Sequence, residues 1–186
     1  MNTSVLKIYE ATTKVICEEG VEACSLSKIR DTSSLAIGTI YYYFKNKEDI
    51  LNSLYLSLVK ELIGAADFSV SKKDYQKTFK SVMGELLEYD RIHPEKAQVR
   101  FALMQSKFIT QETEERAYDY LTPLKELLSD GVDEGVIEDT NKKTLINQCL
   151  WQLAFIANQL QQAGKKRTEN ILNSGISFLW KAIHVS

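Results

Sequence analysis

The sequence predicts an all-α protein, and three observations predict it. Gly and Pro, the two residues that disfavour helix interiors, occur only 8 and 2 times in 186 residues. Apolar residues recur three and four positions apart over long segments. A single run, residues 38–44, has the β-branched and aromatic composition of a strand, and no second such run lies nearby to pair with it. We therefore expect helices throughout.

The first part of the chain predicts a helix, a turn and a second helix. Residues 3–19 carry an amphipathic pattern that ends at Gly20. A short apolar-spaced segment at Leu26 and Ile29 follows, then the polar residues 32–34, and then a further segment at 35–44. This order predicts a helix-turn-helix over about residues 25–44.

Later segments repeat the helical pattern. Pro123 predicts a kink or a new helix start after Thr122, because Pro lacks the N–H that a continuing helix needs. With the three elements above, about nine helices are expected, the later ones at 47–62, from Tyr75 to about 87, 94–108, 118–132, 144–162 and 169–184. The last two carry apolar residues on more than one face, which predicts burial on more than one face and favours a partner subunit as a second cover.

Composition excludes several classes of protein. The formal net charge of −2 argues against a protein that coats nucleic acid over its whole surface, yet residues 23–47 contain four Lys and Arg against one Asp. Three widely spaced cysteines without a CxxC pair predict reduced thiols and no zinc site. No segment approaches the length of a membrane span, and the first residues do not resemble a signal peptide. We expect a cytoplasmic protein.

Residues 38–44, read as a helix, have two different faces. Ile40, Tyr43 and Phe44 fall on one side, and Gly38, Tyr42 and Lys45 fall on the other. An outward face of this kind suits a recognition helix in a DNA major groove, where Gly38 permits close approach and Thr39 and Tyr42 present hydroxyls. Phosphate contacts are then expected from Ser25, Lys28 and Lys47.

Several motifs together resemble the DNA-binding domain of the tetracycline-repressor (TetR) family. They are residues 8–11, Glu19-Gly20, residues 25–29, the Gly-Thr-aliphatic-Tyr-x-x-Phe-x-x-Lys pattern from Gly38 to Lys47, and the segment 45–51. The resemblance covers about the first 60 residues. It implies a three-helix DNA-binding domain at residues 1–61 and a helical effector-binding and dimerisation domain at residues 62–186.

The resemblance also assigns roles within the first domain. Ser25, Thr39, Tyr41, Tyr43 and Lys47 would contact the DNA backbone, while Ile37, Gly38 and Tyr42 would lie closest to bases. Ala36 occupies a position where the family often has Ser. The sequence departs from the family in its turn, where Ser33-Ser34 replaces the usual Ala-Gly. Ser34 is therefore expected in a left-handed conformation at a cost of about 1 kcal/mol.

For the second domain the resemblance implies an effector pocket and a four-helix bundle between two chains. The candidate pocket residues are Tyr89, Phe101, Met104, Phe108, Tyr118, Trp151 and Phe155. The candidate dimer-interface residues are Leu153, Ala157, Leu160, Ile171, Gly175 and Phe178. The small number of charges among the pocket candidates favours an apolar or amphipathic effector.

The leading hypothesis is a homodimeric, ligand-responsive transcriptional regulator, in the usual case a repressor, that binds a pseudo-palindromic operator and is released by a small molecule. The alternative is an all-helical interaction module with vestigial or merely localising DNA binding. An enzyme is disfavoured because His93 and His184, the only histidines, have no nucleophile or metal-ligand partner at a useful spacing. We expect no catalytic residue, metal or cofactor.

Overall fold

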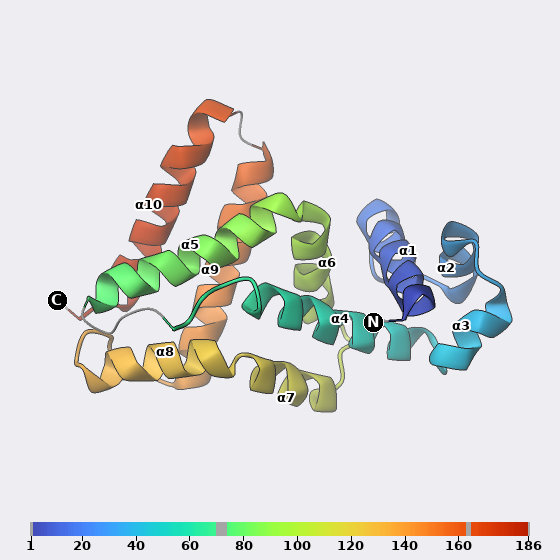
Figure 1. Cartoon of the computed structure of the whole chain (residues 1–186), viewed down its shortest axis with the longest axis horizontal. Helices are drawn as coiled ribbons and strands as arrows, with labels where there is room; N and C mark the ends of the chain where they lie inside the picture. The colour runs from blue at the N-terminus through green and yellow to red at the C-terminus, as the bar shows by residue number, and fades with distance from the viewer. Residues whose placement is uncertain (1, 70–73, 163–164, 186) are drawn as a thin grey trace. The chain divides into compact units, whose positions relative to one another are not determined.

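A computed structural model of the chain describes residues 2–69, 74–162 and 165–185. These residues form ten α-helices (Figure 1). The prediction of an all-α protein is confirmed. The helices are α1 (Thr3–Glu19), α2 (Leu26–Ser33), α3 (Ile37–Tyr43), α4 (Lys47–Ile63), α5 (Tyr75–Ile92), α6 (Pro94–Met104), α7 (Gln111–Tyr120), α8 (Thr122–Asp133), α9 (Lys142–Gln162) and α10 (Lys165–Ile183).

The helix count exceeds the expected nine because the segment around Pro123 forms two helices. A new helix begins at Thr122, with Pro123 in its first turn, where the missing N–H costs no helical hydrogen bond. The preceding helix α7 begins already at Gln111, and the predicted start at 118 is too late. Polar residues dominate α7, so apolar spacing gave little sign of its first turn.

The chain forms two compact units. The N-terminal unit contains the residues up to Val59 together with Glu95–Ala117, and the C-terminal unit contains Lys60–Pro94 together with the residues from Tyr118 onward. Helix α4 contributes to both units. The domain boundary that the sequence suggests after residue 61 falls inside this helix and stays a prediction.

The first three helices of the N-terminal unit pack around isoleucines. Ile8 of α1, Ile29 of α2 and Ile40 of α3 are fully buried. Side-chain caps fix two of the helix starts, because Asn2 accepts a hydrogen bond from the backbone N–H of Ser4 and Ser25 accepts one from that of Lys28. Residues 37–43 are helical, which confirms that the strand-like composition there is overridden by packing.

The turn between α2 and α3 has the expected left-handed residue. Ser34 ends α2 with φ 55° and ψ 24°, a conformation that usually favours Gly. The helix-turn-helix therefore forms with Ser at this position. The strain of about 1 kcal/mol is small compared with the stabilisation from burying Ile8, Ile29 and Ile40 in the core of these three helices.

The C-terminal unit is built on α5, which packs against both α9 and α10, while α8 packs against α9. Phe79, Met83 and Leu86 of α5 are fully buried in its core. The Tyr75 hydroxyl donates a hydrogen bond of 2.7 Å to the carbonyl oxygen of Leu127, which joins α5 to α8. Figure 1 shows α9 and α10 as neighbouring helices with α5 across them.

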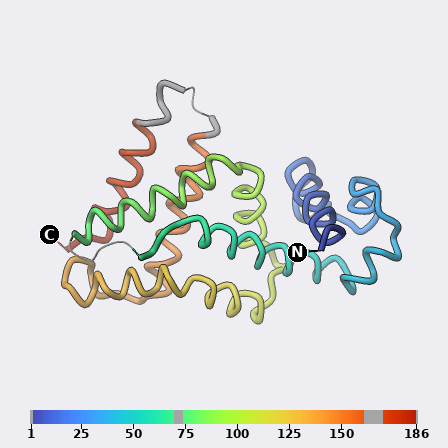
Figure 2. Tube along the Cα trace, viewed as in Figure 1, coloured from blue at the N-terminus to red at the C-terminus, as the bar shows by residue number. Residues whose placement is uncertain are grey.

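The end of the chain is attached to the loop between α8 and α9. Ile137 and His184 form an isolated antiparallel β-bridge, and Val185 donates its N–H to the carbonyl oxygen of Val136. Figure 2 shows the last residues returning to this loop. These backbone contacts join the segment after α10 to the segment between α8 and α9. Among the described residues, no helix has the length and apolar character needed to cross a membrane.

Candidate nucleic-acid interface

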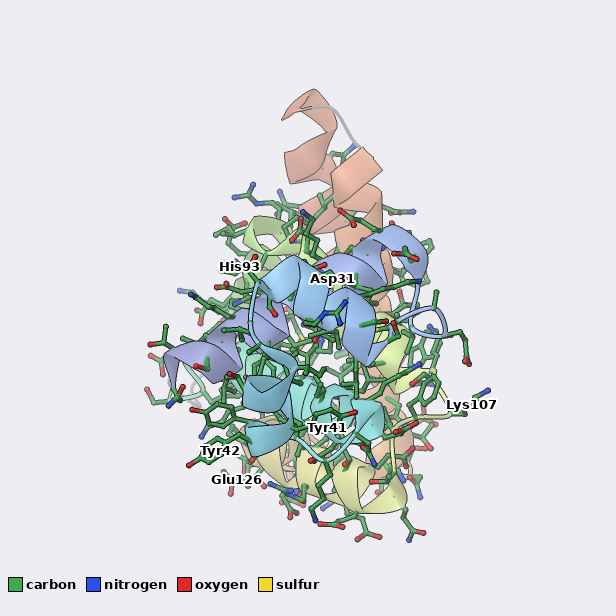
Figure 3. The ribbon with its side chains drawn as sticks, turned by 90° about the vertical axis from the view of Figure 1, so that its right-hand side faces the viewer. Asp31, Tyr41, Tyr42, His93, Lys107 and Glu126 are labelled. Atoms are coloured by element: carbon green, nitrogen blue, oxygen red, sulfur yellow. The ribbon has the colours of Figure 1, made fainter. Side chains whose placement is uncertain are left out.

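Helix α3 has one buried face and one exposed face. Ile40 and Phe44 point into the N-terminal unit, whereas Tyr42 is 81% exposed and Tyr41 is 55% exposed. Figure 3 shows both tyrosines on α3 at the surface of this unit. The two-faced helix that the sequence predicts at residues 38–44 is therefore present. These exposed aromatic side chains do not contribute to core packing. Their exposure on one short helix indicates a binding surface.

Gly38 lies on the exposed face with no structural requirement for Gly. A Cβ atom at this position would meet no atom within 4 Å, and its φ is not in the left-handed region. The absence of a side chain therefore leaves room for an external partner to approach the backbone of α3. Ile37 and Ala36 at the start of the helix are exposed as well.

Two further predicted contact residues of α3 are partly covered. Thr39 and Tyr43 are half-buried. The Tyr43 ring packs edge-on against Tyr42, with 4.9 Å between the ring centroids. This contact restricts the orientation of Tyr42, so its ring is presented with less conformational freedom than an isolated exposed side chain would have.

The predicted phosphate contacts on α2 are placed near its N-terminus. Ser25 caps this helix and shares a 2.9 Å hydrogen bond with the hydroxyl of Ser27. The ammonium of Lys28 donates to a carboxylate oxygen of Glu19 at 2.5 Å and to the carbonyl oxygen of Ala23 at 2.9 Å. Lys28 thus has intramolecular partners that sequence spacing did not indicate.

Lys47, the last residue of the Gly-Thr-aliphatic-Tyr pattern, is also engaged within the chain. Its ammonium donates to the carbonyl oxygens of Val21 and Glu22 at 3.3 and 3.2 Å, and it lies 4.1 Å from the centroid of the Phe108 ring. These contacts connect the start of α4 to the turn after α1 and to the loop after α6. No local pattern indicates the contact with Phe108, which is 61 positions away along the chain.

The candidate pocket residues lie in different parts of the structure. Phe101, Met104 and Phe108 belong to the N-terminal unit, whereas Tyr89 and Tyr118 belong to the C-terminal unit. The Tyr89 hydroxyl donates to Glu61 at 3.0 Å, and Lys125 lies over the Tyr118 ring. Trp151 and Phe155 are exposed on the outer side of α9. Their role as ligand contacts stays a prediction.

An apolar groove of about 1080 Å³ runs along α9 and α10 of the C-terminal unit. Trp151, Phe155 and Phe178 line it, and the last two are 58% and 62% exposed. Ile171 and Gly175 line it too, and a Cβ at Gly175 would lie 2.7 Å from Ile156, so this Gly permits close packing of α10 on α9.

Three of the candidate dimer-interface residues do not lie on the exposed groove. Leu153, Ala157 and Leu160 are buried in the core of the C-terminal unit. The periodicity of α9 identified two apolar faces correctly, but periodicity alone does not indicate which of the two faces is covered by the same chain. The aromatic face is the one left exposed.

The three cysteines are unpaired. Cys24 and Cys149 are buried and Cys17 is half-buried. Burial raises the pKa of the Cys149 thiol to about 12, which keeps it protonated and unreactive. Within the described ranges, no group of three or more His, Cys, Asp or Glu is arranged to hold a metal ion.

Comparison with known proteins agrees with this geometry. Residues 8–54 match the family model described as bacterial regulatory proteins, tetR family. The chain is also 30% identical over 151 residues to the fatty acid metabolism regulator protein of Bacillus subtilis strain 168, covering 78% of this chain and 77% of that protein. The chain belongs to the tetR family. It is accordingly a DNA-binding transcriptional regulator.

Solved structures of other tetR family members share the fold. A TetR family transcription regulator from Marinobacter aquaeolei VT8 superimposes with a TM-score of 0.86 at 20% identity, covering 98% of this chain and 96% of that one. The transcriptional regulator FadR of Bacillus subtilis, in complex with stearoyl-CoA, superimposes with a TM-score of 0.69 at 22% identity, covering 92% and 97%. The tetR fold thus extends through both units.

Proposed function

We propose that this tetR family protein is a homodimeric repressor that binds a pseudo-palindromic operator through α3 and releases it when an acyl-CoA binds. The observation that carries the DNA-binding part is the exposed face of α3, where Gly38 leaves the backbone open and Tyr42 projects outward. Both features match the needs of a helix that enters a major groove. Such a protein acts in the cytoplasm, where the bacterial chromosome lies.

The proposed contacts divide into two kinds. Ile37, Gly38 and Tyr42 would face base edges, with Ala36 beside them at the start of α3. The hydroxyls of Ser25, Thr39, Tyr41 and Tyr43, together with Lys28 and Lys47, would face phosphates. Because Lys28 and Lys47 already bind groups of their own chain, the hydroxyls carry a large share of backbone recognition.

The groove along α9 and α10 supports the dimer. Trp151, Phe155 and Phe178 form an apolar surface that a monomer would leave in water. The same face of a second copy covers it by two-fold symmetry, which produces a bundle of four helices. A two-fold dimer in turn matches a pseudo-palindromic operator, in which each α3 reads one half-site.

The effector proposal is supported by two comparisons, both with fatty acid regulators from Bacillus subtilis. The sequence comparison gives a protein named as a regulator of fatty acid metabolism, and the structural comparison gives FadR in complex with stearoyl-CoA. A long-chain acyl-CoA is amphipathic, which agrees with the apolar or amphipathic effector that the sequence suggests. Release needs only that the acyl-CoA binds one conformation better than the other, and a coupling of about 1–3 kcal/mol weakens operator binding roughly 5- to 150-fold.

DNA binding is tested by selection from a random duplex library with the purified protein. The expected result is enrichment of one inverted repeat whose half-sites are about one helical turn, or a simple multiple, apart. Recovery of no common sequence would contradict operator recognition. The variant Tyr42→Ala serves as the negative control. It removes an exposed side chain of α3 that is proposed to contact bases, and it should abolish the enrichment.

Release is tested on the selected duplex by adding stearoyl-CoA, with free CoA and free stearate as separate controls. We expect stearoyl-CoA to weaken binding at least 5-fold at saturation, with little effect of either fragment alone. Equal effects of stearate and stearoyl-CoA would indicate a fatty-acid effector. No effect of any of the three would contradict the acyl-CoA part of the proposal and leave operator binding untouched.

A further inference from the structure

The two cations of α2 are both neutralised by nearby acids. The ammonium of Lys28 contacts the carboxylate of Glu19, the last residue of α1, at 2.5 Å. The guanidinium of Arg30 contacts the carboxylate of Asp31 at 2.6 Å. All four side chains are partly exposed, so a DNA phosphate can displace the carboxylates from these ion pairs.

The charge of the surrounding segment reinforces this pattern. Residues 1–61 contain seven Lys and Arg and eight Asp and Glu, which gives a net charge of −1. A segment that binds DNA usually has a clear excess of positive charge, since phosphate neutralisation supplies most of the sequence-independent affinity. Over residues 1–61 as a whole, acidic side chains offset the positive charge of residues 23–47.

Glu19 contacts Lys28, a residue that the proposed function assigns to a DNA phosphate. Lys28 lies in the first turn of α2, and its backbone N–H donates to the hydroxyl of the N-cap Ser25. That arrangement favours an anion, because the helix N-terminus and the ammonium attract the same charge. The carboxylate of Glu19 is the anion that Lys28 contacts in the free protein.

We propose that Glu19 is a positioning residue that competes with DNA phosphate for Lys28 and thereby lowers the affinity and the salt dependence of DNA binding. The inference rests on the proposed DNA-binding function. Each phosphate contact of Lys28 requires the Glu19 pair to open. Moderate operator affinity is useful to a regulator, because an effector that weakens binding by a limited factor can then clear the operator.

The test compares Glu19→Gln with the wild type by fluorescence anisotropy on the selected operator and on an unrelated duplex, at several salt concentrations. We expect Glu19→Gln to tighten binding about 2- to 5-fold per half-site, the range set by the worth of an exposed ion pair. The slope of log affinity against log salt should steepen by about 0.9 per chain, since one more cation is free to neutralise phosphate.

Two controls isolate the pair. Glu10→Gln makes the same charge change at an exposed position of α1 and should shift affinity by less than about 1.5-fold, since surface charges away from a contact are screened by salt. In a Lys28→Ala background, Glu19→Gln should have no effect, because its partner is gone. Glu19→Ala is a second variant, and thermal melting verifies that each protein is folded.

Three outcomes would overturn the inference. An unchanged affinity and salt slope in Glu19→Gln would show that Glu19 does not compete for Lys28. Equal effects of Glu19→Gln and Glu10→Gln, or an effect that persists without Lys28, would show a general charge effect. Failure of the wild type to bind any duplex would contradict the proposed function as well, which separates that result from the first two.

Discussion

The ammonium of Lys47 lies over the ring of Phe108, 4.1 Å from its centroid, and donates hydrogen bonds to two carbonyl oxygens of the turn after α1. A second connection lies one turn along α4. The Asn52 amide donates to the carbonyl oxygen of Phe108 at 2.8 Å and accepts from the N–H of Thr110 at 3.0 Å. The start of α4 therefore fastens the loop after α6 to the helix-turn-helix.

Removal of the Lys47 ammonium is expected to lower the stability of the protein. Lys47→Met loses two hydrogen bonds from a charged donor and a cation–π contact, and we expect the free energy of unfolding to fall by about 1–2 kcal/mol. Urea denaturation measures this change. Lys45→Met is the matched control: Lys45 is exposed, and stability should change by less than about 0.5 kcal/mol. Equal losses in both variants would contradict the structural role of Lys47.

Truncation of Tyr42 should separate binding from stability. Because Tyr42 is 81% exposed, Tyr42→Ala should change the free energy of unfolding by less than about 0.5 kcal/mol. Operator affinity should fall by about tenfold or more per half-site, the loss of a base contact worth 1–3 kcal/mol. Anisotropy and urea denaturation give the two values. Ile92→Ala, at an exposed position of α5, should leave operator affinity unchanged.

Two Gly→Ala substitutions should have opposite effects on stability. A Cβ at Gly131 would lie 2.4 Å from the Tyr75 ring and 2.8 Å from Ile137, so Gly131→Ala should destabilise the C-terminal unit by about 1–3 kcal/mol. Gly38→Ala meets open space within a helix and should stabilise the free protein by about 0.5–1 kcal/mol. Operator binding should nevertheless weaken in Gly38→Ala. An unchanged operator affinity would remove Gly38 from the proposed interface.

A charge in the groove of α9 and α10 should produce monomers. Phe178→Glu places a carboxylate at a side chain that is 62% exposed in the single chain, where only a partner subunit would bury it. Sedimentation velocity should show a dimer for the wild type and a monomer for Phe178→Glu, with circular dichroism unchanged. Ile92→Glu, on α5, should remain dimeric. A dimeric Phe178→Glu protein would show that the interface lies elsewhere.

Alkaline pH should destabilise the fold through a buried thiol. Burial raises the pKa of Cys149 from 9.0 to about 12, so the folded state keeps a proton that the unfolded chain loses above pH 9. Stability from this group is complete below pH 9 and decreases as the pH rises toward 12. The urea midpoint should fall more steeply between pH 9 and 10.5 in the wild type than in Cys149→Ser, which cannot ionise there. Identical slopes would contradict this assignment.

Sequence periodicity predicted the helices because each one buries a regular apolar stripe. It also predicted the two faces of α3, which depend on neighbours within a few positions. The left-handed conformation of Ser34 was predicted from the resemblance to the TetR family, whose turn usually has Gly there. The short polar helix α7 was partly missed, because its first turn has few apolar residues to reveal it.

The contacts between distant residues could not be predicted from spacing. The pairing of Lys47 with Phe108 and of Lys28 with Glu19 depends on how helices meet in three dimensions. The same limit applies to α9, where Leu153 and Phe155 both lie on apolar faces but only packing decides that Leu153 is inside and Phe155 outside. Local pattern predicts a helix and its faces, while the choice of neighbour is a property of the whole fold.

The most direct test of the regulator assignment is a fluorescence anisotropy titration of the wild-type protein with a labelled duplex from the DNA upstream of its own gene, or with the selected inverted repeat, in the presence of competitor DNA. We predict saturable binding of two chains per site, a linear fall of log affinity with log salt, and release by stearoyl-CoA. If the protein binds both duplexes no more strongly than it binds competitor DNA, the proposal that it recognises an operator is contradicted.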